Sequence, residues 1–312
     1  MLARRLDKSM NTEDQVTLPD GRKLAFTEFG KPDGEPVLYF HGSPSSRMEP
    51  SLIGDEVFCG LGLRVISPDR PGMGGSDFLP GRGFSDWPAD VNCLADTLGL
   101  KKFSVVGNSG GGPYVAACAA RIPGRLRSAV IVSGGWRMDW PEAKRNVPFV
   151  NRLVFILADK APFLLRLLLK SMGNIAQGDR NKELAQLRTR VPLADYHAFE
   201  APGRLEAFGV TMRESTRQGS EGPAWDLRLY VREFDFRLDE IRIPLLMFHG
   251  EQDMNAPLAM VRRAIAGLPT ARLVIYEMEP HLSTLCNHFN EIAQALLAHG
   301  AGTDISCLDS VE

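Results

Sequence analysis

A single serine among glycines is the residue of this sequence best suited to covalent chemistry. Ser109 stands in the segment Gly-Asn-Ser-Gly-Gly at 107–111, directly after an apolar run at 102–106. A G-x-S-x-G pattern here predicts a sharp turn from strand to helix, which strains the serine backbone and holds the hydroxyl clear of the sheet. The flanking glycines give that turn its room. We therefore predict that Ser109 is a nucleophile.

A phosphate-binding loop is the competing interpretation of these glycines. Such loops follow the patterns G-x-x-x-x-G-K-[ST] or G-x-G-x-x-G. Neither pattern fits residues 107–112. The segment therefore favours covalent catalysis over phosphate binding.

A serine hydroxyl is a poor nucleophile at neutral pH, so it needs a base and a third group that orients the base. His281 meets the first need, because Glu-Pro-His-Leu-Ser at 279–283 follows the last predicted strand. His41 and His249 each end an apolar run before a glycine, and we expect them to orient loops through hydrogen bonds. The other histidines fall in predicted helices: His197, His288 and His299.

The acid of such a triad should follow a strand between the serine and the histidine. Asp253 does so, at the end of the segment Phe-His-Gly-Glu-Gln-Asp at 248–253. Glu251 is the nearest competitor, and we expect it to be a surface residue. We therefore predict Asp253 as the group that fixes the imidazole tautomer.

Attack on a carbonyl places negative charge on its oxygen, so backbone N–H groups must already point at that oxygen. The N–H of Gly110 comes with the turn at Ser109. The second donor is predicted at Ser43, in the glycine-containing loop after the first central strand. Together these two residues form the predicted oxyanion hole.

These loops need a scaffold, and the chain alternates between strand and helix patterns. A hairpin is expected around Asp20-Gly21, and helices are expected at 87–98, behind an N-cap at Ser85, and at 283–298. The buried strands are predicted at 36–40, 63–67, 102–106, 127–133, 241–248 and 272–276. This alternation predicts an α/β fold with a mostly parallel central sheet that presents ligands at the carboxyl ends of its strands.

Residues 136–236, which we call the helical insertion, break this alternation. Helical periodicity dominates there and no buried-strand run occurs. We predict that the helical insertion forms a cap over a core made of residues 1–135 and 237–312. Its apolar segments at 147–150 and 164–169 should in part line a covered, largely apolar pocket above Ser109.

The composition of the chain indicates which kinds of binding partner to expect. The chain has 312 residues, of which 44% are hydrophobic and 24% charged, with a formal net charge of −2. This balance gives no electrostatic reason to expect nucleic acid or an anionic membrane as a partner. The longest apolar segments are shorter than the ~20 residues that a membrane span requires. We expect a small-molecule substrate and no metal or other cofactor.

The cysteines and the chain ends suggest a location. The five cysteines are widely spaced without a C-x-x-C pair, so neither a disulfide framework nor a zinc site is indicated. Residues 11–15 are polar where an export signal needs an apolar core. We expect a cytoplasmic protein with a frayed polar tail at 300–312.

The motifs together resemble the α/β-hydrolase superfamily over about residues 16–300. They are His-Gly-Ser-Pro at 41–44, the loop at 69–77, the serine turn at 107–111, His-Gly-Glu-Gln-Asp at 249–253 and Pro-His-Leu-Ser at 280–283. Their order is that of the family: nucleophile, acid, histidine. The resemblance implies the same roles for Ser109, Asp253 and His281 and for the N–H groups of Ser43 and Gly110.

Within the superfamily, the HG-x-P loop and the predicted cap resemble the branch of epoxide hydrolases, haloalkane dehalogenases, haloperoxidase-like esterases and prolyl iminopeptidases. The first two use an aspartate nucleophile, whereas this chain has Ser109. Prolyl iminopeptidases usually carry HGGPG and a tryptophan after the nucleophile, whereas this chain has Ser43 and Gly110 at those places. The usual glycine before the histidine is Pro280 here.

We therefore expect a cofactor-independent serine hydrolase that cleaves an ester or amide bond of a small, fairly apolar molecule through an acyl-enzyme on Ser109. The alternatives are a prolyl iminopeptidase-like aminopeptidase and a non-hydrolytic triad enzyme such as a hydroxynitrile lyase or a C–C bond hydrolase. A binding protein on an inactive scaffold is disfavoured because all three triad members are present.

Overall fold

The computed structural model describes residues 14–144, 147–172 and 180–300. The expectation of no export signal rests partly on residues 1–13, which lie outside the described residues. So do residues 301–312, which carry most of the polar tail and Cys307.

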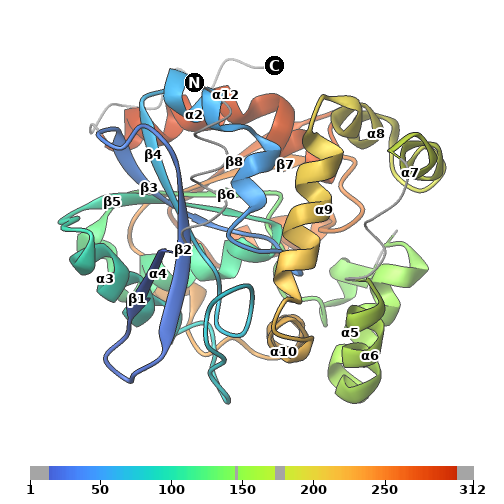
Figure 1. Ribbon diagram of the computed structural model, residues 1–312, viewed down its shortest axis with the longest axis horizontal. Helices are drawn as coiled ribbons and strands as arrows, with labels where there is room; N and C mark the ends of the chain where they lie inside the picture. Colours follow the sequence, from blue (N-terminus) through green and yellow to red (C-terminus); the bar gives the residue numbers. More distant parts are fainter. Residues whose placement is uncertain (1–13, 145–146, 173–179, 301–312) are drawn as a thin grey trace.

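An eight-stranded sheet forms the centre of the molecule (Figure 1), in the order β1-β2-β4-β3-β5-β6-β7-β8. The strands are β1 (Asp14–Thr17), β2 (Lys23–Gly30), β3 (Glu35–Phe40), β4 (Leu63–Pro68), β5 (Phe103–Asn108), β6 (Leu126–Val132), β7 (Leu245–Gly250) and β8 (Ala271–Tyr276). The pairs β1–β2 and β2–β4 are antiparallel, and all other neighbours are parallel. The predicted α/β fold with a mostly parallel sheet is confirmed.

The predicted buried strands are all present, with boundaries that differ by at most two residues except at β7. The hairpin around Asp20-Gly21 is the antiparallel pair β1–β2. β7 begins at Leu245, whereas the sequence predicted a start at 241. Residues 238–240 instead form a short 3₁₀ helix, and Pro244 has no N–H to donate to a neighbouring strand.

Helices cover both faces of the sheet. The core helices are α2 (Asp55–Gly60), α3 (Trp87–Thr97), α4 (Gly112–Arg121), α11 (Leu258–Ile265) and α12 (His281–Gly300), with 3₁₀ turns η1 (Glu49–Leu52), η2 (Ser109–Gly111) and η3 (Pro123–Arg125). Side chains of α3, α4 and α11 share one buried cluster with the sheet, and those of α2 and α12 share another. The core is therefore a three-layer α/β/α arrangement.

The start of α3 differs from the prediction. Its N-cap is Asp86, one residue after the predicted Ser85, and no side chain caps it. Ser85 instead donates its hydroxyl to the carbonyl of Asp235, at 3.1 Å. The Ser85 prediction is wrong because a long-range partner takes the hydroxyl that a local cap would have used.

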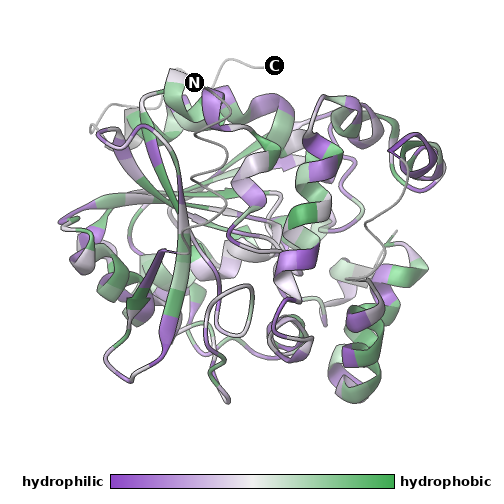
Figure 2. Cartoon of the chain, in the orientation of Figure 1, coloured by the Kyte–Doolittle hydropathy of each residue, from purple (hydrophilic) through white to green (hydrophobic). Residues whose placement is uncertain are grey.

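The helical insertion lies between β6 and β7 and gathers on one side of the molecule (Figure 1). Its elements are η4 (Pro141–Lys144), α5 (Phe149–Lys160), α6 (Pro162–Met172), α7 (Arg180–Leu187), α8 (Leu193–Glu200), α9 (Arg204–Ser215) and α10 (Glu221–Leu229); η5 (Leu238–Glu240) follows it. Figure 2 shows apolar residues concentrated along α5 and α6 as well as along the sheet. Among the described residues, no helix combines the length and apolarity needed to cross a membrane.

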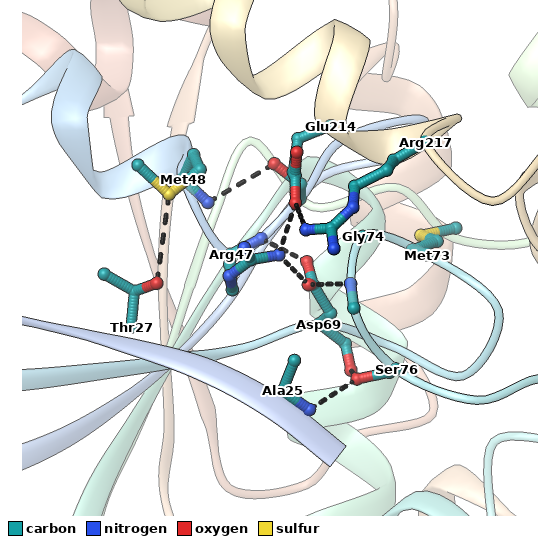
Figure 3. A network of polar contacts seen from close by, with 12 residues as sticks. Ala25, Thr27, Arg47, Met48, Asp69, Met73, Gly74, Ser76, Glu214 and Arg217 are labelled. Carbon is teal, nitrogen blue, oxygen red and sulfur yellow. Dashed lines mark hydrogen bonds and ion pairs between the residues drawn. The ribbon is translucent and has the colours of Figure 1, made fainter. Parts of the chain in front are cut away.

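A buried ion cluster ties the helical insertion to the core (Figure 3). The guanidinium of Arg47, in the loop after β3, contacts the carboxylate of Asp69, which follows β4. The same guanidinium lies 2.7 Å from Glu214 on α9. Because the Asp69 side chain is fully buried, this contact fixes α9 against the two core loops.

Candidate active site

The turn at Ser109 has the strained geometry expected of it. Ser109 has a φ of 51°, a left-handed conformation that non-glycine residues rarely adopt. A Cβ at Gly107 would lie 2.5 Å from the carbonyl oxygen of Gly111, and one at Gly111 would lie 2.0 Å from that of Phe40. Side chains at these two positions would therefore prevent the turn, which places Ser109 at the carboxyl end of β5.

Asp253 and His281 form a hydrogen-bonded pair. Asp253 follows β7, and its Oδ2 lies 2.7 Å from Nδ1 of His281. Its Oδ1 accepts the backbone N–H groups of Asn255 and Ala256, both at 2.8 Å. The carboxylate is thus held by its own loop and aimed at one ring nitrogen, which leaves Nε2 of His281 for another partner.

The two members of this pair shift each other's pKa. Burial by itself lowers the pKa of His281, but the Asp253 charge and hydrogen bond outweigh it and raise that pKa above its ordinary value. Burial by itself raises the pKa of Asp253, and His281 outweighs it and lowers that pKa. The pair therefore favours an ionised carboxylate beside an imidazole that readily takes a second proton.

His281 is the first residue of α12, although the sequence placed it in a loop. Asp195, from α8 of the helical insertion, accepts the backbone N–H groups of Leu282 and Ser283 at 2.9 and 2.8 Å. Ser133, which has a φ of 47°, donates its hydroxyl to the carbonyl of His281 at 3.1 Å. The helix start that carries His281 is therefore fixed from both the core and the insertion.

Sequence reasoning missed both of these supporting residues. Ser133 begins a Ser-Gly-Gly run directly after β6, and that run at a strand end was the available signal for a strained turn. Asp195 stands 87 positions before its first partner and has no comparable local signal.

The two predicted oxyanion residues lie in contact. A Cβ at Gly110 would lie only 2.7 Å from the hydroxyl oxygen of Ser43. That hydroxyl contacts Asp226 and accepts a hydrogen bond of 2.6 Å from Arg70. The Tyr230 hydroxyl donates to the carbonyl of Gly110. The loop after β3 and the turn after β5 are thus held side by side, as a shared oxyanion site requires.

Asp226, on α10, has a buried carboxylate that the sequence analysis did not identify. It forms ion pairs with Arg70 at 2.9 Å and Arg82 at 2.8 Å, and it accepts the Tyr114 hydroxyl. Burial by itself raises the pKa of Asp226, but the two guanidinium charges outweigh it and lower that pKa. Since Arg70 also bonds to Ser43, this cluster connects the helical insertion to the predicted oxyanion loop.

Glu49 also joins these two loops. Its carboxylate accepts the hydroxyl of Tyr39, the side-chain amide of Asn108 and the backbone N–H of Gly42, each at 2.9 Å. The Ser45 hydroxyl is a fourth donor. Because Asn108 precedes Ser109 and Gly42 precedes Ser43, Glu49 links the predicted nucleophile to the predicted oxyanion loop.

The predicted catalytic groups border one cavity, which has a volume of about 390 Å³. Ser109, His281, Ser43 and Gly110 all line it. The helical insertion supplies mostly apolar walls: Met138, Val150, Val154, Phe155, Leu187, Val191, Phe199, Phe208, Met212 and Leu227. The structure thus brings the predicted nucleophile, base and oxyanion donors to one space under the insertion.

The sequence predicted only part of this lining. Val150, from the segment 147–150, reaches the cavity, whereas no residue of 164–169 does. Leu165 and Leu169 are buried in a cluster that α6 shares with α5 and α10, and Leu164 and Leu167 are exposed. That segment packs within the insertion itself and does not lie over Ser109.

The competing candidates His41, His249 and Glu251 do not line the cavity. His41 is buried and bonds to the Gly42 carbonyl at 2.9 Å, and burial lowers its pKa well below the ordinary value. Nε2 of His249 lies 2.8 Å from the carbonyl of Ala256, within the loop that carries Asp253. The Glu251 side chain is exposed. Within the described ranges, no three His, Cys, Asp or Glu side chains gather as metal ligands.

Comparison with known proteins gives one family. Residues 35–285 match a family model described as "alpha/beta hydrolase fold". A non-heme chloroperoxidase of Streptomyces lividans is 30% identical over 293 residues, which cover 91% of this chain and 98% of that protein.

Two further relatives carry different activities in their names. A bifunctional esterase/perhydrolase of Acinetobacter calcoaceticus is 27% identical, over 85% of this chain and 92% of that protein. A 2-hydroxy-6-oxononadienedioate/2-hydroxy-6-oxononatrienedioate hydrolase of Paraburkholderia phymatum is 30% identical, over 75% of this chain and 73% of that protein.

Proposed function

The chain belongs to the family with the alpha/beta hydrolase fold, and we propose that within this family it is a serine hydrolase that cleaves an ester of a small, largely apolar molecule. One observation carries the proposal. The strained Ser109 lines the same cavity as His281, whose Nδ1 lies 2.7 Å from Asp253. A serine, a base and an acid in this arrangement are the parts of a nucleophilic triad.

In the proposed first step, the Ser109 hydroxyl oxygen attacks the ester carbonyl carbon and His281 takes the hydroxyl proton. Asp253 holds the imidazole in the tautomer that leaves Nε2 free, and its charge stabilises the imidazolium. The N–H groups of Ser43 and Gly110 stabilise the oxyanion. His281 then returns the proton to the leaving alcohol, and the acyl group remains on Ser109.

In the second step, water attacks the acyl-enzyme. His281 takes one proton from the water, and the resulting tetrahedral intermediate collapses to the free acid while Ser109 recovers its proton. All groups used in the cycle belong to the chain or to the substrate and water. The proposed reaction therefore consumes one ester and one water and releases one acid and one alcohol.

We assign to the helical insertion the role of a cap, with residues 1–135 and 237–312 as the catalytic core. Its support is the lining of the cavity, because the core supplies most of the polar groups and the insertion supplies most of the apolar walls. An apolar enclosure of about 390 Å³ suits small or medium acyl groups and is too small for a long triglyceride.

A C–C bond hydrolase is the second candidate, favoured by the 30% identity to the oxononadienedioate hydrolase. The name of that relative's substrate describes a dicarboxylate. The described residues that line the cavity include no Lys or Arg, and they do include Glu49 and Asp195. A doubly anionic substrate would therefore meet no positive side chain other than protonated His281, so we favour ester hydrolysis.

Covalent labelling tests the proposal. We expect a fluorophosphonate probe to modify the wild-type protein at one site, Ser109, as located by mass spectrometry of its peptides. Ser109→Ala should lose both labelling and ester hydrolysis, with kcat lower by about 10⁴ to 10⁶-fold. Ser128→Ala removes a buried serine of β6 and is the matched control, with labelling and activity retained.

Labelling at another residue, or full ester hydrolysis by Ser109→Ala, would show that Ser109 is not the nucleophile. Labelling of Ser109 without turnover of a broad ester panel, together with cleavage of a vinylogous 1,5-diketone, would favour the C–C bond hydrolase.

A further inference from the structure

The charged groups of the catalytic cavity are unbalanced. Glu49 and Asp195 line it, and no Lys or Arg does so in the part of the chain that the structure describes. Both carboxylates are buried, with 4% of Glu49 and 6% of Asp195 exposed. Their negative charges therefore act on a cavity with largely apolar walls, where charge interactions are stronger than in bulk solvent.

The two carboxylates differ in how their oxygens are used. Both oxygens of Glu49 accept hydrogen bonds, from four donors in all. Asp195 accepts the N–H groups of Leu282 and Ser283 through Oδ1 alone. The Ser283 side chain also stabilises the Asp195 carboxylate by a hydrogen bond. Asp195 thus has fewer donors than Glu49 and is the carboxylate better able to take a further donor from a ligand.

Aromatic rings stand beside Asp195. Asp195 and Phe199 are four residues apart on α8, so their side chains share one face of that helix. The ring of Phe199 lies 5.2 Å from that of Phe208 on α9, centroid to centroid. All three residues line the cavity. A carboxylate beside aromatic rings is a favourable site for an organic cation, because the ring faces also attract positive charge.

We propose that the cavity selects substrates by charge and takes an ester that carries one positive charge, a protonated amine or a quaternary ammonium, against Asp195, Phe199 and Phe208. The inference rests on the proposed esterase function and names the substrate class for that site. A neutral ester of the same shape is a poorer substrate, and an ester with a free carboxylate is the poorest.

The cost of removing water from each ester's charged group explains the expected order of cationic, neutral and anionic esters. An ammonium that enters the cavity loses water but gains the Asp195 charge, whereas a carboxylate loses water and meets two like charges. Burial already raises the pKa of Asp195, which reflects the cost of holding its charge there. A bound cation lowers that cost, and a neutral group does not.

Three nitrophenyl esters of similar size test the order. They are the 4-nitrophenyl esters of 4-(trimethylammonio)butanoic acid, of its carbon isostere 5,5-dimethylhexanoic acid, and of glutaric acid with its second carboxyl free. Each kcat/KM is divided by the rate constant for hydroxide hydrolysis of the same ester. We expect the cationic ester to exceed its isostere by tenfold or more, and the isostere to exceed the glutarate by tenfold or more.

Asp195→Asn assigns this preference to one residue. The asparagine Oδ1 still accepts both N–H groups, so the start of α12 and His281 keep their support. We expect the ratio of the cationic to the isosteric ester to fall at least fivefold in this variant. Glu56→Gln removes one charge from an exposed position on α2, and its ratio should equal that of the wild type.

The ratio also separates charge selection from a general effect on catalysis. The charges of Asp195 and Glu49 both help to raise the pKa of His281. A role limited to His281 would change all three esters equally and leave the ratio unchanged, and that result in Asp195→Asn overturns the proposal. A wild-type ratio near or below one does so too. Should Asp195→Asn not fold, the wild-type ratio and choline binding by Ser109→Ala still decide.

Binding to Ser109→Ala distinguishes failure of the inference from failure of the esterase proposal. Calorimetric titration with choline and with its neutral isostere 3,3-dimethylbutan-1-ol requires no turnover. Tighter binding of choline, by tenfold or more, supports the cation site even if no ester is hydrolysed. Equal binding overturns the site, and ester hydrolysis would then stand without it.

Discussion

The two sides of the catalytic cavity are formed by different kinds of structural element. The core side consists of loops at the ends of strands, and its polar side chains are held in hydrogen bonds: Asp253 accepts two backbone N–H groups besides His281, and Glu49 has four donors. The insertion side consists mostly of helices, and its contributions are largely apolar, with Asn151, Asp195, Thr211 and Tyr230 as exceptions.

The two sides of the cavity are therefore suited to different functions, proton transfer on the core side and substrate selection on the insertion side. Hydrogen-bonded groups on short loops keep fixed positions, which a proton transfer over a few ångströms needs. Apolar helix faces offer shape and can change residue by residue without leaving a polar group unpaired. We therefore expect substitutions on the core side to change rate or stability by large factors and substitutions on the insertion side to change selectivity.

The largest expected effect on this comparison comes from Asp253. Asp253→Asn keeps the shape of the side chain, but its amide favours the wrong imidazole tautomer, so kcat should fall by about 10⁴-fold. Glu251→Gln, a change of the same kind two residues earlier at an exposed position, should stay within about twofold of wild type. The reverse order of the two variants would move the acid to Glu251.

Asp226 lies where the two sides meet, and its loss should affect stability more than chemistry. Asp226→Asn leaves the buried guanidinium groups of Arg70 and Arg82 without their shared anion. We expect the free energy of unfolding in a urea titration to fall by about 3–5 kcal/mol. Asp239→Asn breaks an exposed pair with Arg237 and should leave the unfolding midpoint unchanged. Equal midpoints for the two variants would contradict a structural role for the cluster.

The pH dependence of kcat/KM for a neutral ester should reveal the effect of Asp253 on the pKa of His281. His281 acts as a base only when neutral, and its pKa is raised, chiefly because the Asp253 charge outweighs burial. Activity should therefore rise with pH through an ascending limb centred above 6.5, the ordinary histidine pKa, and fall about tenfold per pH unit below it. A rate independent of pH between about 5 and 9 would be incompatible with a histidine base.

The smallest effect is expected on the insertion side. Phe155 on α5 lines the cavity, so Phe155→Ala should enlarge it and shift preference from butanoate toward octanoate esters by roughly tenfold, with kcat for the preferred ester nearly unchanged. Phe163→Ala on α6, where the ring is 69% exposed and does not line the cavity, is the control. Efficient hydrolysis of emulsified long-chain lipid by the wild type would contradict an enclosed cavity.

The fold was predictable because its signals are local. Continuous apolar runs predicted the buried strands, and the G-x-S-x-G pattern predicted the strained turn at Ser109. His281 and Asp253 were identified because each follows a strand, and parallel strands bring their carboxyl ends to one edge of the sheet. Chain order and strand ends thus contained the information that placed the predicted triad in one region.

The tertiary structure alone decided what surrounds that triad. Asp195 supports the start of α12 across 87 positions of sequence, and Asp226 reaches Arg70 across 156. An acidic residue in a helix pattern looks the same whether it faces water or a buried partner, because the hydrogen bonds that distinguish the two cases cross the fold. The sequence therefore determined the sheet and the motifs it carries, and only the packing of the helical insertion against the core loops determined the charge and shape of the cavity.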